Sequence, residues 1–198
     1  PRWHLATAQD RAAAREALDL PQAAPIVTCV GRFSRQKGQD SLIDAWRLVS
    51  KELPEARLLL VGDGPTGDDL RKGAPDTVIF TGATDDPRPF LAACDVAALP
   101  SRWEGLSLSM LEAMASGRSV VTTAVAGSEV VADSDCGAVV PVDEPQAFAR
   151  ALLPRLSGLI EADVEGRRGH QYVIDHHDFD TQMARFAAVI SRAHAFGR

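Results

Sequence analysis

The sequence has few cysteines and few aromatic residues. Its 198 residues include three cysteines and one tyrosine, and aromatic residues make up 6%. The cysteines are odd in number and widely spaced, and each lies beside apolar residues: Cys29, Cys94 and Cys136. This pattern predicts buried thiols in a reducing compartment, and it argues against a disulfide framework or a zinc site.

Long hydrophobic runs and an excess of positive charge are also missing. No apolar stretch approaches the roughly 20 residues of a membrane-spanning helix, and the first residues do not show a signal-peptide pattern. The net charge is -6, which argues against nucleic acid or an anionic membrane as a general partner. Apart from DHHD (175–178), the five histidines show no spacing typical of metal ligands. We interpret DHHD as a polar helix end rather than a metal site.

Short runs rich in leucine and β-branched residues alternate with helical patterns, which is typical of βαβ units and a parallel sheet. Apolar residues on both faces of the strands indicate a sheet that is covered on both sides. We expect an α/β fold, a doubly wound, Rossmann-like parallel sheet of about six strands with helices on both faces, in one domain over 1–198. The predicted strands are Ile26–Val30, Arg57–Val61, Thr77–Thr81, Val96–Leu99, Ser119–Thr122 and Ala138–Val140. The predicted helices between them are Gln39–Glu52, Asp68–Lys72, Pro89–Ala93, Ser107–Ser116, Ser128–Ala132 and Gln146–Leu153.

The two ends of the chain carry further predictions. PRWHLATAQDRAAAREAL (1–18) enters a helical pattern without a preceding strand, so we expect a piece of a longer protein. After Pro154, closing helices are predicted near 158–173 and 180–195. The last one is amphipathic and basic, so it would either lie on a membrane surface or, as we favour, pack against the body of the protein.

Doubly wound sheets bind ligands beyond the carboxyl ends of their strands, so the loops there are candidate sites. The first is GRFSRQKG (31–38), where Arg32, Arg35 and Lys37 place three cations within six residues. Its glycines let backbone N–H groups approach a ligand, and the next helix points its N-terminus at the loop. The loop either holds a pyrophosphate, through an arginine fork and a lysine charge, or is a solvated basic turn.

The second loop, in LLLVGDGPTGDDL (58–70), matches the G-x-G-x-x-G spacing of a dinucleotide-binding turn, and Asp85 follows at about the distance of a ribose-binding acid. However, Asp63, Asp68 and Asp69 would repel a pyrophosphate, and the motif follows the second strand rather than the first. We therefore interpret it as a tight structural turn, and we disfavour an NAD-linked oxidoreductase.

The segment PSRWEGLSLSMLEAMASG (100–117) carries two spaced glutamates. Glu104 precedes the predicted helix and Glu112 lies within it, on the order of 10 Å away at about 1.5 Å of rise per residue. That is too far for the close carboxylate pair of a retaining glycoside hydrolase, and it fits two anchors along an extended ligand. We expect Glu112 to be partly buried, where ligand hydroxyls would serve as partners, and the N–H groups of residues 106–108 to be open to an anion. The alternative is a capping serine beside incidental surface glutamates.

The loop TTAVAGSEVV (122–131) is either a ligand-facing segment of small residues or an ordinary turn with a capping serine. This loop and the other loops belong to six segments that together resemble one known family. In chain order the segments are VGRFSRQKG (30–38), LLLVGDGP (58–65), VIFTGA (78–83), DVAALPSRWEGLSLSMLEAMASG (95–117), VVTTAVAGSEVV (120–131) and GAVVPVDEP (137–145). These segments resemble the carboxyl-terminal, donor-binding domain of the family 4 retaining glycosyltransferases, which have the GT-B fold. The resemblance covers roughly 10–155 and is weaker in FDTQMARF (179–186).

The resemblance implies a nucleotide-sugar site and the residues that form it. Arg32 and Lys37 would hold the diphosphate and, with Glu104, would be the catalytic residues. Glu112 would bind the ribose hydroxyls and Glu104 the hydroxyls of the donor sugar. The complete set of implied donor-binding residues is Gly31, Arg32, Lys37, Glu104, Gly105, Leu106, Ser107, Leu108 and Glu112. The donor would be of the UDP or GDP type, and retaining, hexosyl-like transfer would proceed without a metal or another cofactor.

The sequence departs from the family pattern in several places. Arg118 and Ser119 stand where a proline usually precedes the VV strand, and Leu106 and Ser107 replace a common phenylalanine and glycine. Ser107 narrows the space near the sugar, so the donor sugar is left open. The GT-B fold also needs an amino-terminal acceptor domain, which we expect these 198 residues to lack, so the chain alone should bind donor and turn over little. The full-length protein would be cytoplasmic or peripheral at the inner membrane face. A non-catalytic nucleotide-binding module is the alternative, and the intact glutamate pair and cations disfavour it.

Overall fold

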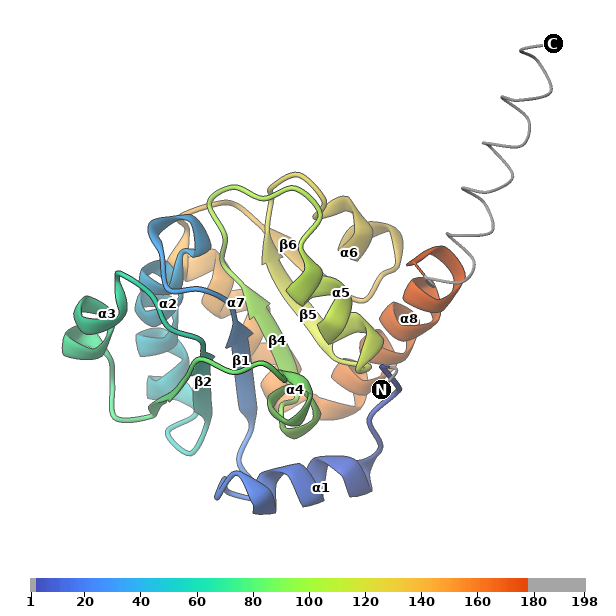
Figure 1. The fold of residues 1–198 in the computed structure, drawn as a ribbon, viewed down its shortest axis with the longest axis horizontal. Coiled ribbons are helices and arrows are strands. Elements are labelled where there is room, and N and C mark those ends of the chain that lie inside the picture. The colour runs from blue at the N-terminus through green and yellow to red at the C-terminus, as the bar shows by residue number, and fades with distance from the viewer. Residues whose placement is uncertain (1–2, 178–198) are drawn as a thin grey trace, which may run out of the picture.

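The computed structural model describes residues 3–177 of the chain. Six parallel strands form one sheet in the order β3-β2-β1-β4-β5-β6 (Figure 1). The chain therefore winds outwards from the centre of the sheet in one direction and then in the other, which confirms the predicted doubly wound α/β fold. The strands are β1 Ile26–Val30, β2 Arg57–Val61, β3 Val78–Gly82, β4 Val96–Leu99, β5 Ser119–Thr123 and β6 Gly137–Val140.

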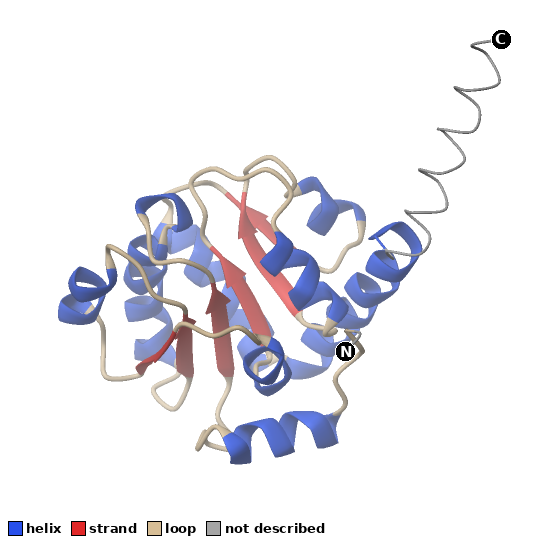
Figure 2. Ribbon diagram, viewed as in Figure 1, coloured by secondary structure: helices blue, strands red, loops and turns tan. Residues whose placement is uncertain are grey.

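Helices cover both faces of the sheet (Figure 2). Helices α2 and α7 pack together on one face, and α5 and α8 pack together on the other. The described helices are α1 Ala8–Ala17, α2 Gln39–Glu52, α3 Gly67–Gly73, α4 Arg88–Ala93, α5 Leu108–Ala115, α6 Glu129–Asp133, α7 Pro145–Ser157 and α8 Leu159–His177, with a short 3-10 turn, η1 Arg35–Lys37.

The strand residues alternate between two hydrophobic cores. Val27 and Cys29 of β1 belong to the core under α2 and α7, which also holds the fully buried Trp46. Ile26 belongs to the opposite core, together with Met114 of α5. Because both faces are buried, the strands carry apolar residues at nearly every position, which is why their sequences lack a polar alternation.

The boundaries of most described elements agree with the prediction to within two residues, and the carboxyl ends of α7 and α8 differ most. The predicted helix ends at Leu153, but α7 continues through Pro154 to Ser157, although proline is disfavoured in a helix interior. A proline this close to the end removes a single N–H bond, and the Pro154 carbonyl still accepts a bond from the Gly158 N–H at 2.7 Å. The helix predicted over 180–195 lies outside the described residues.

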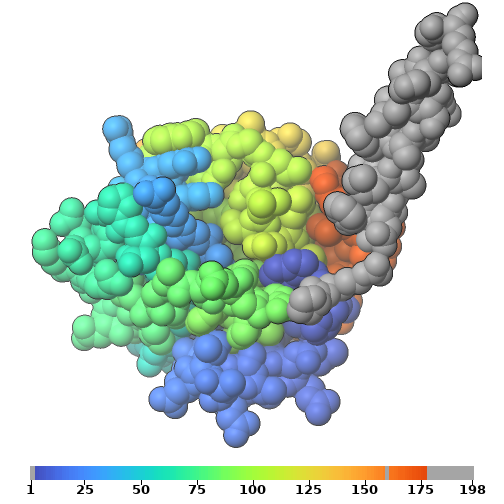
Figure 3. All heavy atoms as spheres, viewed as in Figure 1, coloured from blue at the N-terminus to red at the C-terminus, as the bar shows by residue number. Residues whose placement is uncertain are grey.

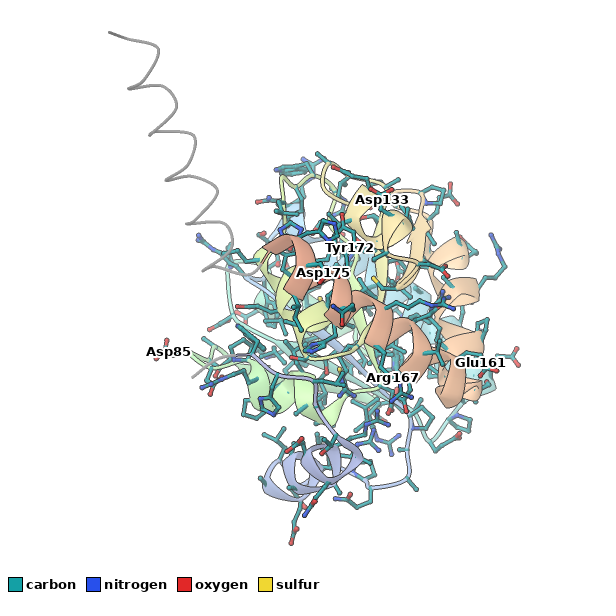
Figure 4. The ribbon with its side chains drawn as sticks, turned by 90° about the vertical axis from the view of Figure 1, so that its right-hand side faces the viewer. Asp85, Asp133, Glu161, Arg167, Tyr172 and Asp175 are labelled. Carbon is teal, nitrogen blue, oxygen red and sulfur yellow. The ribbon has the colours of Figure 1, made fainter. Side chains whose placement is uncertain are left out.

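Helix α8 also exceeds its prediction, because it continues beyond Val173 to His177. Figure 4 views the molecule from the side on which α8 lies and labels Tyr172 and Asp175 in the last turns of that helix. The Tyr172 ring stacks on the His176 ring with 4.2 Å between centroids. The two rings lie one helical turn apart, on residues 172 and 176 near the end of α8.

All three cysteines are free and buried, as predicted. Burial raises the pKa of the Cys29 thiol to about 12 and that of Cys136 to about 11. Thiols held protonated in this way are poor nucleophiles and poor metal ligands, so they act as core residues.

A buried ion pair fastens α1 to the sheet. Arg15 Nη2 lies 2.8 Å from Asp95 Oδ2, and the Ile26 N–H donates to the same oxygen at 2.8 Å. The other Arg15 N–H groups donate to three backbone carbonyls, and Arg11 Nη1 lies 3.1 Å from Asp95 Oδ1. Both members of the pair are almost completely buried, so removing one leaves a desolvated charge without its partner.

We expect Asp95→Ala to lower the free energy of unfolding by about 3 kcal/mol, because Arg15 would remain buried and unpaired. Urea unfolding followed by circular dichroism measures the change. Asp69→Ala, which breaks an exposed pair with Lys72, is the matched control and should change stability by less than about 1 kcal/mol. Equal effects of the two substitutions would contradict the anchoring role of Asp95.

Candidate functional site

The strand order places the loops after β1 and β4 side by side. β1 pairs with β2 on one edge and with β4 on the other, so the direction of winding reverses between β1 and β4. Ligands bind doubly wound sheets at such a reversal, beyond the carboxyl ends of the strands. The segments 31–38 and 100–107 lie next to each other at the top of Figures 1 and 3. Except for Glu112, all the predicted site residues lie on these two segments or at the start of α5.

Glycine allows the two segments to approach closely. Gly38 has a left-handed backbone with φ of 66°, and a Cβ at this position would lie 2.1 Å from the Pro100 carbonyl oxygen. We call residues 31–38 the basic turn. At its other end, the Gly31 N–H donates to the Val61 carbonyl at 2.9 Å. Both ends of the turn that carries Arg32 and Lys37 are thus fixed to neighbouring strand ends.

Lys37 and Glu104 form an ion pair across the two segments. Ser101 Oγ donates to the same glutamate oxygen, Oε1, at 3.1 Å. The Lys37 side chain is 24% exposed and that of Glu104 is 12% exposed, so the pair is sheltered but reachable from solvent. The structure therefore brings together two residues that the sequence assigned to different parts of one ligand.

Glu112 is half-buried on α5, as predicted. Burial raises the pKa of its carboxyl above the ordinary value, and no hydrogen bond or ion pair from residues 3–177 reaches it. Partial burial disfavours the charged form of this carboxyl, and no donor from the described residues compensates for it. It is well suited to accept hydrogen bonds from ligand hydroxyl groups.

Arg32 and the start of α5 are open to solvent. The Arg32 side chain is exposed. Gly105 and Leu106 in the segment 100–107, and Leu108 at the start of α5, are exposed as well. Ser107 is the N-cap of α5, but its hydroxyl makes no capping bond and lies 3.0 Å from Ser109 Oγ instead. The interpretation of Ser107 as a capping serine is therefore wrong, and the first N–H groups of α5 stay available to a ligand.

The loop after β5 packs against the segment 100–107. Gly127 has φ of 84°, and a Cβ there would lie 2.4 Å from the Gly105 carbonyl oxygen. Thr123 Oγ1 donates to the Ser101 carbonyl. The small residues of this loop thus permit close packing behind Glu104, and Ser128 at the start of α6 makes no side-chain capping bond.

The glycine turn after β2 is packed against the basic turn. A Cβ at Gly62 would lie 2.1 Å from the Gly31 carbonyl oxygen, and one at Gly64 would lie 2.3 Å from that of Phe33. The Gly64 N–H already donates to Asp63 Oδ1 at 2.7 Å. Protein atoms occupy the approach that a pyrophosphate needs at a dinucleotide-binding turn, so these glycines serve close packing between two loops.

Sequence reasoning missed Ser101 and Arg102, although both lie inside the segment that it singled out. Ser101 contacts Glu104, and Arg102 pairs with Asp40 and Asp143, which are 62 and 41 residues away in the chain. A serine or arginine in a polar loop has no local pattern that indicates such partners.

Within residues 3–177, no group of three or more histidine, cysteine or acidic side chains is arranged to hold a metal ion. The stretch DHHD begins in the last turn of α8, and its fourth residue lies outside the described part of the chain. No helix in the same range is long and apolar enough to cross a membrane.

The chain belongs to the glycosyltransferases, and it is a member of the family described as glycosyl transferases group 1, whose profile matches residues 24–157. It is 37% identical over 166 residues to the lipopolysaccharide core biosynthesis glycosyltransferase LpsE of Rhizobium meliloti, covering 81% of this chain and 48% of LpsE. It is 33% identical over 184 residues to a GDP-mannose-dependent phosphatidylinositol monomannoside mannosyltransferase of Corynebacterium glutamicum, covering 87% of this chain and 48% of that enzyme. The chain thus spans about half the length of these relatives.

Solved glycosyltransferase structures share the fold. Sucrose-phosphate synthase from Thermosynechococcus elongatus is 28% identical with a TM-score of 0.82, covering 98% of this chain and 50% of that one. Anabaena HepE in complex with UDP-glucose is 25% identical with a TM-score of 0.83, and the match covers 96% of this chain and 54% of HepE. The C-terminal domain of LpcC from Francisella tularensis is 23% identical with a TM-score of 0.79. The match covers 89% of this chain and 96% of the LpcC domain, which shows a shared fold. The doubly wound sheet and its helices match one Rossmann-like half of these GT-B glycosyltransferases.

The raised pKa of Glu112 predicts how the stability of the free protein depends on pH. The folded state holds this proton more tightly than the unfolded state, whose pKa is near the ordinary value of 4.5. The contribution of Glu112 to stability is therefore present below pH 4.5 and is lost as the pH rises through the higher folded pKa. Glu112→Gln removes the titration, so the variant should gain stability relative to wild type across this window.

Urea unfolding at a series of pH values measures that difference between Glu112→Gln and wild type. Glu55→Gln, which removes the charge of an exposed glutamate, is the control and is measured over the same pH series. A flat or oppositely sloped difference for Glu112→Gln would show that the carboxylate is not strained by burial.

Proposed function

We propose that this chain, residues 1–198, is the donor-binding domain of a family 4 retaining glycosyltransferase. The whole enzyme would transfer a hexose-like sugar from a nucleotide-diphosphate sugar to an acceptor. The observation that carries the proposal is the half-buried carboxylate of Glu112, which has no partner among residues 3–177, on α5, the helix that follows the Glu104 segment. Ligand hydroxyl groups would supply the hydrogen-bond donors that the described residues do not give this carboxylate.

Each residue of the site would hold one part of the donor. Arg32 and Lys37 would bind the diphosphate, the arginine through a fork of N–H groups and the lysine as a point charge. Glu112 would accept hydrogen bonds from the ribose hydroxyls, and Glu104 from hydroxyls of the sugar. Four further positions would approach the sugar and phosphates through their backbone: Gly105, Leu106, Ser107 and Leu108. Gly31 would allow the diphosphate to lie close to the end of β1.

The chemistry would need no metal ion. As the bond between the anomeric carbon and the phosphate oxygen breaks, negative charge grows on the departing diphosphate. Arg32, Lys37 and the N–H groups at the start of α5 would stabilise that charge directly. In the free protein Lys37 is paired with Glu104, so a bound donor would share both groups: the phosphate would contact the ammonium and the sugar hydroxyls would contact the carboxylate.

The donor would be of the UDP or GDP type. Two comparisons support this: HepE was solved in complex with UDP-glucose, and the corynebacterial relative is described as GDP-mannose-dependent. Because the chain spans about half of its relatives, the acceptor site would lie on an amino-terminal GT-B domain. The isolated chain would bind donor and turn over little.

Calorimetry and thermal shift with UDP, GDP, ADP, dTDP and NAD test the donor site. We expect one nucleoside diphosphate to stabilise the protein, and Arg32→Ala and Glu112→Gln each to weaken its binding about tenfold, as expected for one charge-assisted hydrogen bond. Lys51→Ala and Glu55→Gln, which change an exposed cation and an exposed acid on or near the far end of α2, should leave the affinity unchanged.

Two outcomes would contradict the proposal. A response to NAD alone would return the function to the glycine turn after β2. Nucleoside diphosphate binding that is unaffected by both site variants would place the ligand elsewhere on the chain.

A further inference from the structure

Arg102 makes the most extensive side-chain network near the site. Its Nε donates to both carboxylate oxygens of Asp143, at 2.8 and 3.0 Å. Its Nη1 donates to Asp40 Oδ1 at 3.0 Å and to the Arg35 carbonyl at 2.8 Å, and its Nη2 donates to Asp40 Oδ2 at 2.8 Å. One guanidinium therefore binds two carboxylates and a backbone carbonyl, which uses the fork geometry that only arginine offers.

The partners of Arg102 come from three different parts of the fold. Arg35 lies in the basic turn, Asp40 lies in the first turn of α2, and Asp143 lies between β6 and α7. The Arg102 side chain is 17% exposed although both acids are more than half exposed, so the arginine lies beneath the surface with its partners around it. Asp143 has a left-handed backbone with φ of 54°, a conformation that needs local support in a residue other than glycine.

The backbone around Arg102 joins the same two segments. The Arg102 N–H donates to the Gln36 carbonyl at 2.7 Å, and Gln36 Nε2 donates back to the Trp103 carbonyl at 3.0 Å. These bonds lie within two residues of both Lys37 and Glu104. The network is therefore placed to determine how far apart those two side chains are held.

We propose that Arg102 is a positioning residue that clamps the basic turn to the segment after β4, and so holds Lys37 and Glu104 at the spacing that a donor diphosphate and sugar require. This inference rests on the proposed donor site. The arginine points towards Asp40 and Asp143 and would not itself contact the donor. Its effect would come from geometry, so a lysine, which keeps the charge but loses the fork, would not replace it.

The test compares wild type with Arg102→Lys and Arg155→Lys. Arg155 is the matched control, because it forms a two-bond pair with Glu165 at 2.7 and 2.8 Å, is similarly sheltered, and joins α7 to α8 away from the site. Hydrogen exchange over residues 31–38 and 100–107 measures the clamp without any ligand. Calorimetry with the nucleoside diphosphate that stabilises the wild type measures its effect on the site.

We expect Arg102→Lys to speed exchange in both segments by about tenfold and to weaken nucleoside diphosphate binding by about tenfold, the equivalent of one lost charge-assisted bond. Arg155→Lys should change neither quantity, even where urea unfolding shows a similar loss of stability. The proposal would be overturned if Arg102→Lys left hydrogen exchange in the two segments unchanged. It would also be overturned if Arg102→Lys made exchange faster but left the affinity for the nucleoside diphosphate unchanged. If the wild type binds no nucleoside diphosphate, the proposed function fails, and the exchange measurement alone supports or overturns the clamp.

Discussion

The parallel pairing of β1 with β4 is the constraint on which the site depends. Val27 lies opposite Val96 and Thr28 opposite Ala97, so two strands whose paired residues are 69 positions apart in the chain end at the same edge of the sheet. The sheet is buried on both faces, and sliding these strands would expose core residues and leave ladder bonds unmade. The positions of the basic turn and of the glutamate segment follow from that fixed register.

Glycine converts this neighbourhood into direct contact. At Gly38, Gly62, Gly64 and Gly127 the space that a Cβ would fill is taken by a backbone oxygen of another loop. The loops at the carboxyl edge are thus packed on one another rather than free in solvent, which prepares side chains such as Lys37 and Glu104 in a defined arrangement. A site built in this way loses little conformational entropy when a ligand binds.

The same edge also carries features that oppose stability. Glu112 is partly desolvated without a partner, and Asp143 holds a left-handed backbone. Elsewhere the fold holds buried charges in ion pairs, of which the Arg15–Asp95 pair is the clearest, although Asp95 Oδ1 accepts no hydrogen bond from the described residues. The left-handed backbone is not confined to this edge, because Asp19 and Asp135 adopt it elsewhere in the fold. The partly desolvated carboxylate of Glu112 is the feature that a binding site on a rigid sheet is expected to show.

The sequence by itself determined the doubly wound fold, the approximate bounds of the described strands and helices, and the loops in which a site had to lie. These properties are local, because hydrophobic runs, helical stripes and glycines report the backbone within a few residues. Only the tertiary structure decided that Lys37 contacts Glu104, that Arg102 joins Asp40 to Asp143, and that the glycines after β2 face Phe33 rather than a dinucleotide. Those contacts depend on the order and register of the strands, which bring together side chains that no local pattern connects.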